Sequence, residues 1–279
     1  MGDAKAANPF TAKSIALIAL VLSLIFSSCA SSPIKFPNII SLAEEIEIGR
    51  RASQQIEKEA RILKMQAMEE YIQRLGQRLA RNSDLPQISY RFKVIDNDQV
   101  NAFALPGGYI YIYTGLIEAC QTESQLVSVI AHEIGHAAAR HWSQMASAQQ
   151  GINLVASIVF TVLGAPAAWQ RDIMGLAVGL GFLAYSRSQE SEADRLGLRY
   201  MTRTGYNPEG MVGMFEVLMS AHQKEPSRLS SLFLSHPLTS SRIENTREAL
   251  QHIPPYPGPD QPVTNTPEFS IIKSYFLRD

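Results

Sequence analysis

The segment from Ala131 to Trp142, AHEIGHAAARHW, places three histidines and a glutamate within an apolar stretch of the chain. Thr122 and Gln125 have the spacing of a capping box, which begins a helix, and the apolar residues after them favour a long one. On a helix, His132 and His136 share one face, with Cβ atoms roughly 5–6 Å apart. The sequence therefore predicts a helix from Glu123 to Trp142 with two imidazoles on a face that would otherwise be buried.

A bound zinc ion explains why this face carries polar groups. Two imidazoles at this spacing can both reach one zinc ion at about 2.0–2.1 Å. Glu133 stands beside them, where a carboxylate can take a proton from a water that zinc activates. The alternative is a helix with structural histidines that are satisfied by hydrogen bonds. The capped and apolar surroundings favour zinc.

A third zinc ligand is sought in the segment QESEADRLG. Glu190 and Asp194 are four residues apart and share a helix face, whereas Glu192 faces elsewhere. One carboxylate can bind the metal while another accepts a hydrogen bond from a ligand imidazole. Spacing alone does not choose between Glu190 and Glu192. The alternative is a solvated acidic patch beside Arg187 and Arg195.

The composition favours a folded protein with no affinity for nucleic acid. The chain has 279 residues, of which 46% are hydrophobic and 18% are charged, and this is enough apolar material for a core. The formal net charge is -1, and no basic stripe of the kind that binds nucleic acid is present. We therefore expect no nucleic-acid partner, and the near-neutral charge says nothing positive about other partners.

Residues 1–28 resemble the signal peptide of a lipoprotein. An apolar run from Ile15 to Phe26 is shorter than the roughly 20 residues that a spanning helix needs. Small residues precede Cys29, as in a bacterial lipobox, although Phe26 stands where leucine is usual. An ordinary signal peptide and an uncleaved anchor are the alternatives. We expect lipidation at Cys29, and the absence of a following Asp favours the outer membrane. Cys120 then has no disulfide partner.

The rest of the chain reads as one domain between two extended segments. We expect a linker over residues 29–41, a folded domain with the zinc site over 42–252 and a Pro-rich extended tail over 253–279. Alternation around Phe92, a turn at Gly107–Gly108 and alternation in Tyr109–Tyr113 predict a small antiparallel hairpin. The apolar stretch 152–185 is interpreted as core or lid helices, or else as a flap that faces a membrane or a substrate.

Together these motifs resemble metallopeptidase family 48. HEIGHAAARH and SRSQESEADRLG carry the resemblance, and EEIEIGRRASQQI, LGQRLA, NAFALPGGYIYIYTGLI and LSHPLTSSR agree with it over roughly residues 42–250. The family includes the HtpX, CAAX prenyl and Oma-type proteases and the bacterial envelope proteases of the BepA and LoiP kind, which this chain resembles most. HtpX and CAAX proteases have several spanning helices, and the BepA kind has a repeat domain. Because this chain shows neither, we expect the catalytic domain alone on a lipid anchor.

The resemblance implies roles for particular residues. It implies that Glu190 is the third zinc ligand, with Asp194 as its outer partner. His236 and Arg242 correspond to catalytic residues, and His236 is either a fourth ligand in a resting state or a group that stabilises the oxyanion. We expect His141 to be an outer contact or exposed, because it lies off the ligand face.

The Tyr109–Tyr113 strand is a candidate for peptide binding. An exposed strand edge pairs with an extended peptide through main-chain hydrogen bonds. We expect this edge to be lined by Asn101, Ala102, Phe103 and Ala104. The alternative is a core strand.

The expected fold is α+β and mostly helical, a zincin-like (gluzincin) metallopeptidase domain with a small antiparallel β-sheet. The expected activity is zinc-dependent endopeptidase cleavage of misfolded or unassembled envelope proteins, with one Zn²⁺ per chain. The rival interpretation is a zinc-binding periplasmic chaperone or assembly factor that cleaves little.

Overall fold

The computed structural model describes residues 38–149, 185–253 and 261–276. The chain divides into two compact units, and almost all of the described residues belong to the one formed by residues 40–143 and 183–279. Only residues 38–39 and 144–149 are described in the other unit. The expected signal peptide, Cys29 and the apolar stretch before Tyr185 lie outside the described residues. In the described ranges, no helix has the length and hydropathy needed to cross a bilayer.

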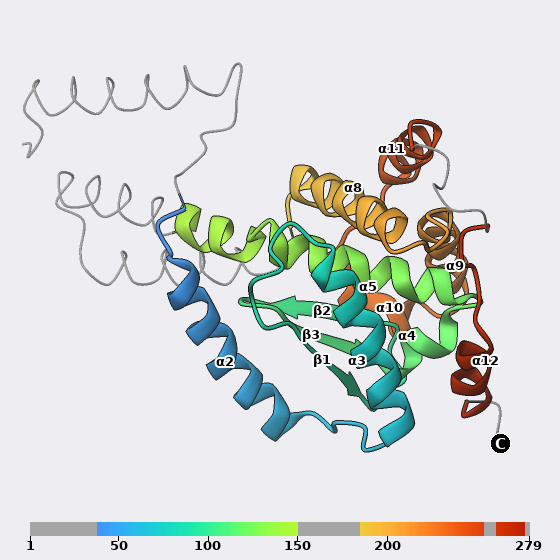
Figure 1. Ribbon diagram of the computed structural model, residues 1–279, viewed down its shortest axis with the longest axis horizontal. Helices are drawn as coiled ribbons and strands as arrows, with labels where there is room; N and C mark the ends of the chain where they lie inside the picture. Colours follow the sequence, from blue (N-terminus) through green and yellow to red (C-terminus); the bar gives the residue numbers. More distant parts are fainter. Residues whose placement is uncertain (1–37, 150–184, 254–260, 277–279) are drawn as a thin grey trace, which may run out of the picture. The chain divides into compact units, whose positions relative to one another are not determined.

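The unit of residues 40–143 and 183–279 is mostly helical, as predicted, around one small sheet (Figure 1). Three of its helices begin with a capping box that satisfies some of their first N–H groups, including the predicted box at Thr122 and Gln125. In chain order its described helices are α2 (Leu42–Glu59), α3 (Gln66–Arg81), α4 (Thr114–Ala119), α5 (Glu123–Ala138), α8 (Arg187–Arg203), α9 (Gly210–Lys224), α10 (Pro226–Ser235), α11 (Ser240–Gln251) and α12 (Pro267–Ser274).

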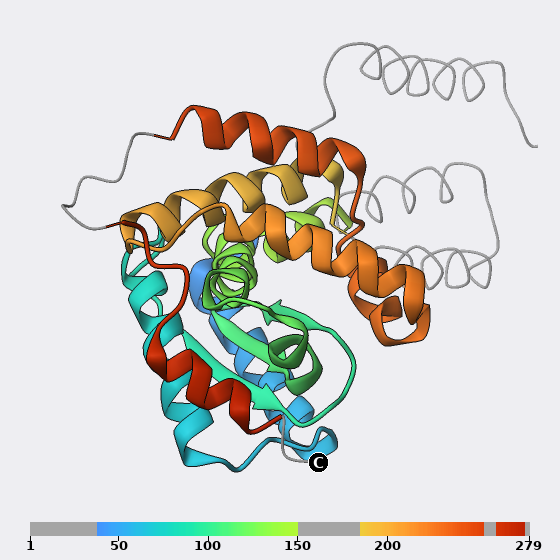
Figure 2. The ribbon, with the colours of Figure 1, turned by 90° about the vertical axis from the view of Figure 1, so that its right-hand side faces the viewer.

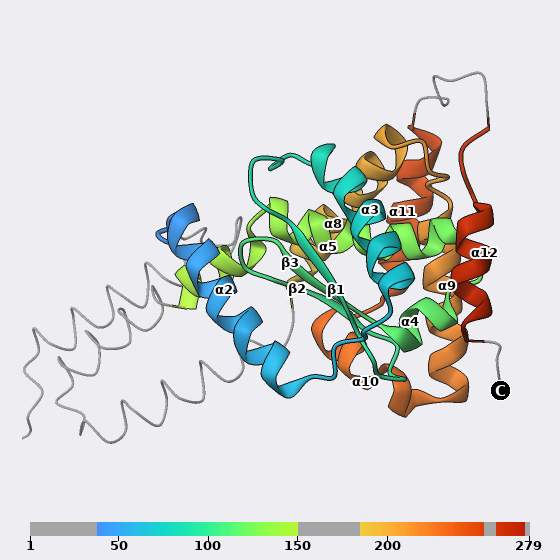
Figure 3. The same cartoon turned by 60° about the horizontal axis from the view of Figure 1, so that its bottom comes forward.

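The sheet has three strands in the order β1–β3–β2 (Figure 1), and Figure 3 shows the same strands from another side. The strands are β1 (Arg91–Ile95), β2 (Ala102–Leu105) and β3 (Tyr109–Tyr113). β3 pairs with β1 in parallel and with β2 in antiparallel register, so the sheet is mixed and the prediction of a purely antiparallel one is wrong. The Gly107–Gly108 turn joins β2 to β3, because both glycines have the positive φ that such a turn needs.

The two faces of the sheet meet different helices. On one face Phe92 lies against Gly76 of α3, and Ile110 and Ile112 are completely buried in the core. On the other face the hydroxyl of Tyr111 lies 2.8 Å from that of Ser53 on α2. β3 is therefore a central strand, which is the alternative to the predicted exposed edge, and β2 is an edge strand.

α5 runs through the core of this unit and packs closely against α8. A side chain at Gly135 would place its Cβ 2.9 Å from the carbonyl oxygen of Ala193, and one at Gly197 would lie 3.2 Å from the backbone nitrogen of His132. Both glycines thus allow the two helix backbones to approach. This close packing brings the first turn of α8 to the histidine face of α5. α11 lies along α8 (Figure 2).

The C-terminal segment is only partly extended. Val263 forms a bridge with Tyr206, and α12 follows it, with Phe269 and Ile272 buried in the core. The carbonyl of Thr264 accepts a hydrogen bond from the N–H of Ser124 at the start of α5. The apolar residues between Pro267 and Ser274 explain the helix, since they have a core face to cover, whereas the proline-rich composition before them suggested none.

Candidate metal centre

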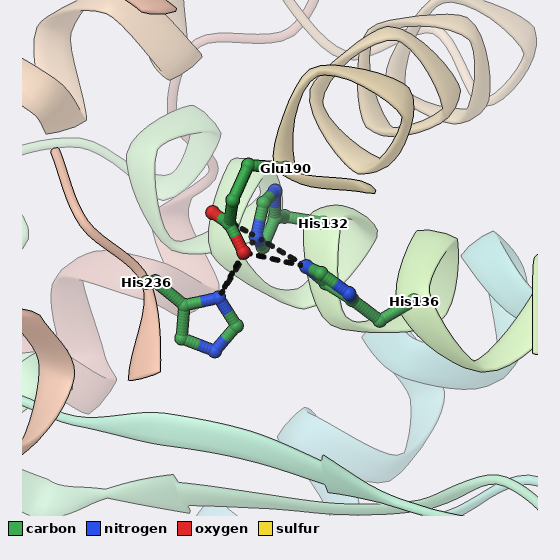
Figure 4. Close-up of side chains that lie close together, drawn as sticks. All are labelled: His132, His136, Glu190 and His236. Atoms are coloured by element: carbon green, nitrogen blue, oxygen red, sulfur yellow. Dashed lines mark hydrogen bonds and ion pairs between the residues drawn. The ribbon is translucent and has the colours of Figure 1, made fainter. Parts of the chain in front are cut away.

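Four side chains from three parts of the chain converge on one point (Figure 4). His132 and His136 come from α5, Glu190 comes from the first turn of α8, and His236 follows the last residue of α10. All four are buried, and one donor atom from each lies within 4.8 Å of the others. Pro237 stands directly after His236, where it prevents α10 from continuing. The structure thus brings Glu190 to the two predicted histidines and leaves Glu192 outside the group.

The spacing of these donor atoms fits a tetrahedral metal ion. Ligands at about 2.0–2.1 Å from a tetrahedral zinc ion lie about 3.3 Å from one another. Here Nε2 of His132 lies 3.0 Å from Nε2 of His136 and 3.6 Å from Oε2 of Glu190, and Nε2 of His136 lies 3.3 Å from Oε1 of Glu190. Nδ1 of His236 lies 3.4 Å from Nε2 of His132 and 2.9 Å from Oε1 of Glu190. The geometry suits the predicted three ligands and can include His236.

Asp194 and Arg242 support this group from behind. Oδ1 of Asp194 lies 2.9 Å from Nδ1 of His132, so the imidazole can turn its Nε2 toward the metal position. Arg242 donates to both oxygens of Asp194 at 2.7 and 2.8 Å, and its Nη1 lies 2.6 Å from Oε2 of Glu190. The guanidinium therefore joins the two carboxylates, which explains how both stay charged while buried.

The charges of these groups follow from their contacts. Burial raises the pKa of Glu190, but contacts with His136 and His236 outweigh burial and leave it well below its ordinary value. Burial likewise raises the pKa of Asp194, and hydrogen bonds from His132 and Arg242 bring it below its ordinary value. Burial lowers the pKa of His136 far enough to keep this imidazole neutral. These are the protonation states that metal ligands need.

Glu133 is a buried carboxylate with one oxygen that accepts no hydrogen bond from the described residues. It is 1% exposed, and its Oε2 has no hydrogen-bond partner among the described residues. Its Oε1 lies 3.6 Å from Nε2 of His236. Burial lowers the pKa of His236, but the charges of Glu133 and Glu190 outweigh burial and raise it above its ordinary value. A buried carboxylate oxygen without a hydrogen-bond donor is costly, so this position indicates a function other than stability.

A hollow opens beside Glu133 and His236, and its walls are mostly apolar. The polar part of its lining includes His132, Asp194 and Arg242. The apolar part comes from α5, α9, α10 and the loop after α10, and consists of Val129, Met211, Met214, Phe215, Leu218, Leu232, Phe233 and Leu238. A pocket with few polar groups beside apolar walls is the usual form of a small binding site.

Two residues near the metal position were missed or left open by sequence reasoning. The ring of Tyr185 lies 3.9 Å from that of His136, centroid to centroid, just before α8 begins. The signal in the sequence that could have identified Tyr185 was its position next to the segment that contains Glu190. His141 is completely buried, and its Nδ1 lies 2.9 Å from Nδ1 of His136. The exposed alternative for His141 is therefore excluded, and it is an outer contact of the site.

The residues predicted to bind a peptide lie along the sheet edge. Ala102, Phe103 and Ala104 belong to β2, and Asn101 directly precedes it. β2 packs against α5, which carries the two histidines. Within the described residues, no hydrogen bond or ion pair joins them to the four side chains of the candidate metal centre. His222 and His252 are exposed.

Comparison with known proteins agrees with the motifs. The model of peptidase family M48 matches residues 66–250. A beta-barrel assembly-enhancing protease of Yersinia pestis is 29% identical over 226 residues, or 78% of this chain and 46% of the relative, and that of Escherichia coli K12 is 30% identical over 77% and 46%. The mitochondrial metalloendopeptidase OMA1 of Saccharomyces cerevisiae is 33% identical over 61% of this chain and 49% of its own length. The chain thus spans about half the length of the relatives that it matches. With two thirds of its residues matched by the family model, and with the histidine pair and the later glutamate brought together, the chain belongs to peptidase family M48.

Proposed function

We propose that the protein is a zinc-dependent metalloendopeptidase that cleaves misfolded or unassembled proteins of the cell envelope. The observation that carries the proposal is the meeting of His132, His136 and Glu190 beside a buried carboxylate, Glu133, whose Oε2 has no hydrogen-bond partner in the part of the chain that the structure describes. Zinc bound there would polarise the scissile carbonyl and acidify a water. One ion per chain is expected.

The residues around the ion would divide the work of hydrolysis. Glu133 would take the proton of the attacking water at its free Oε2 and pass it to the leaving amine. His236 would have one role in the resting state and another during the reaction. In this structure its Nδ1 lies among the donor atoms, and its Nε2 faces Glu133. Once it turns from the donors, a protonated His236 would stabilise the oxyanion, which joins the two alternatives that the sequence left open. Arg242 holds Glu190 and Asp194 and would act through them.

The edge of β2 would bind the substrate backbone. In an antiparallel ladder, residue pairs that exchange hydrogen bonds alternate with pairs that do not. Tyr113 donates to the carbonyl of Asn101, and Phe103 lies opposite Tyr111, so Asn101 and Phe103 turn their main-chain groups toward β3. Ala102 and Ala104 turn theirs to the other side, where no further strand pairs within the described residues. An extended peptide can add there as a fourth strand.

The apolar hollow would receive a substrate side chain next to the scissile bond. It borders Glu133 and His236 on one side and is closed by Met, Phe and Leu side chains on the others. Unfolded envelope proteins expose large apolar side chains of the kind that fit such walls. The hollow thus supports a preference for unfolded over folded substrates.

The cellular setting rests on the relatives and the N-terminal sequence. Two relatives are named beta-barrel assembly-enhancing proteases. The predicted lipidation at Cys29 would place the domain in the periplasm, at the outer membrane. Both supports are independent of the metal site.

The test compares wild-type protein with Glu133→Gln and with Glu123→Gln. Glu123 is a matched control, because it is also a buried glutamate on α5 but lies at the start of the helix, outside the donor group. Unfolded casein is incubated with each protein, and zinc content is measured by elemental analysis. We expect Glu133→Gln to keep about one zinc per chain and to lose activity by roughly 10²–10⁴-fold. Glu123→Gln should keep both.

Two outcomes would contradict the proposal. Identical fragments from wild type and Glu133→Gln would remove the protease function. A wild-type protein that suppresses aggregation of an unfolded β-barrel protein, binds zinc and cleaves nothing would favour the chaperone instead.

A further inference from the structure

His141 contacts a metal-site imidazole from a position that a continuous helix would not give it. It lies five residues after His136, which on an unbroken helix is well off the ligand face. Yet its side chain is completely buried, and its Nδ1 lies 2.9 Å from Nδ1 of His136. On its other side, Nε2 of His141 lies 3.4 Å from Oε2 of Glu192, whose side chain on α8 is 44% exposed.

A sharp turn after α5 explains this placement. The helix ends at Ala138, and Arg140 has a φ of 56°, in the left-handed region that a residue with a side chain rarely adopts. Arg140 is held there by hydrogen bonds to Oε2 of Glu45 at 2.6 Å and to the carbonyl of Ile40 at 2.7 Å. Glu45 is itself buried on α2. The turn interrupts the helix between Ala138 and His141, and it places His141 against His136.

The contacts allow one arrangement of protons when His136 holds a metal. Nε2 of His136 faces the other donors, so its proton must sit on Nδ1. That Nδ1–H donates to Nδ1 of His141, which must therefore be the unprotonated nitrogen of a neutral ring. The proton of His141 is then on Nε2 and points to the carboxylate of Glu192. Along His136, His141 and Glu192, each contact thus joins one donor to one acceptor.

The two ligand imidazoles of α5 thus have different supports. Nδ1 of His132 faces a buried carboxylate, Asp194, directly. Nδ1 of His136 faces a second imidazole, which passes the interaction on to a partly exposed carboxylate. Outer partners of this kind fix the tautomer and orientation of a metal-binding histidine.

We propose that His141 is a positioning residue that fixes the tautomer and orientation of His136 for metal binding, with Glu192 orienting His141 in turn. This inference rests on the proposed function only in taking His136 as a ligand. It concerns the affinity for zinc, and activity is not needed to test it.

The experiment uses three substitutions and measures zinc affinity by competition with a chelator, without substrate. His141→Leu keeps much of the side-chain volume and removes the acceptor. His141→Asn is the matched control, because its Oδ1 stands where Nδ1 of histidine stands and can accept the same hydrogen bond. Glu192→Gln keeps an acceptor and removes the charge. Urea unfolding of each metal-free protein reports separately on stability.

We expect His141→Leu to bind zinc roughly 10- to 100-fold more weakly than wild type. His141→Asn should recover most of that loss, to about tenfold tighter than His141→Leu. Glu192→Gln should weaken binding by at most about fivefold, since the charge is partly exposed. A residue that only fills space would give equal zinc affinity for the leucine and asparagine variants.

The proposal fails if His141→Leu binds zinc as tightly as wild type, or if His141→Asn is no better than His141→Leu. If His141→Leu does not fold, the zinc affinities of wild type, His141→Asn and Glu192→Gln decide. A larger loss of zinc affinity for Glu192→Gln than for His141→Asn would contradict the proposal that Glu192 acts through His141. Failure of the proposed function looks different, because wild type itself would then bind no zinc or cleave nothing.

Discussion

The four side chains that converge at the candidate metal centre lie between a polar region and an apolar region. Toward α8 and α11, polar side chains interlock: Asp194 contacts His132, and Arg242 joins Asp194 to Glu190. Toward α9 and α10, the walls are Met, Phe and Leu side chains, and Oε2 of Glu133 has no hydrogen-bond partner among the described residues. Arg242 belongs to both sides, since its guanidinium also lies 5.0 Å from the ring centroid of Phe215.

The polar surroundings suit the binding of a metal ion, and the apolar surroundings suit the binding of a substrate. Where each buried charge has a partner, the side chains have one arrangement, which suits the binding of an ion that requires fixed geometry. Where the walls are apolar and one oxygen of Glu133 accepts no hydrogen bond from the described residues, the surroundings favour a ligand that brings both an apolar group and a proton donor. The following predictions test whether changes on one side leave the other unaffected.

The largest effect is expected from Arg242→Met, which breaks the polar side. The substitution leaves Glu190 and Asp194 as buried carboxylates without their shared cation, and removal of one partner from a buried ion pair costs about 3–5 kcal/mol. The free energy of unfolding of the metal-free protein, measured in urea, should fall by this amount.

Arg247→Met is the matched control for this change. Arg247 is on the same helix, and its pair with Glu216 is exposed, at 57% and 60%. Its loss should cost about 0–1 kcal/mol. Equal losses for the two arginine variants would show that the polar network contributes nothing beyond a surface ion pair.

A smaller effect is expected from Val129→Phe, which changes the apolar side. Val129 lines the hollow one helical turn before Glu133, so a larger ring there reduces the room for a substrate side chain. For peptides with Leu or Phe next to the cleaved bond, kcat/KM should fall by about 10- to 200-fold, or about 1–3 kcal/mol. Peptides with Ala there should be cleaved almost as before, and zinc affinity should not change.

Val217→Phe serves as the control for added volume. Val217 is a partly buried valine on α9 that packs against the core but does not line the hollow. If it shifts the preference between Leu and Ala as much as Val129→Phe does, then the hollow does not select the substrate side chain.

The two sides also differ in how far the sequence predicts them. His132, Glu133 and His136 belong to one helix, and helical periodicity alone places them together. Glu190 comes from a helix some fifty residues later, and spacing did not separate it from Glu192; the resemblance to the family did. The close packing that brings α8 to α5 depends on Gly135 and Gly197, and no local pattern states which backbone a glycine will meet.

Other features could not be predicted because they depend on breaks in regular structure. The position of His141 follows from one left-handed residue, Arg140, which no helix rule anticipates. β2 was missed as the partner of β3 because the segment AFAL does not alternate in polarity, and only its pairing identifies it. The hollow is formed by helices α9 and α10, whose apolar residues look like any core face in sequence.

The smallest effect is expected at the edge of β2, where proline at one of two neighbouring residues should lower peptide cleavage and proline at the other should lower stability. Ala104→Pro removes an N–H that points to the free edge, while Phe103→Pro removes one that faces β3. One hydrogen bond contributes about 0.5–1.5 kcal/mol, so Ala104→Pro should lower kcat/KM for an extended peptide by about 2- to 13-fold with little change in urea stability. Phe103→Pro should instead lower the free energy of unfolding, because it breaks the ladder inside the protein. If both prolines destabilise the protein equally and peptide cleavage falls only in proportion to the folded fraction, the free edge takes no part in binding, and the substrate must be held by the hollow and the metal alone.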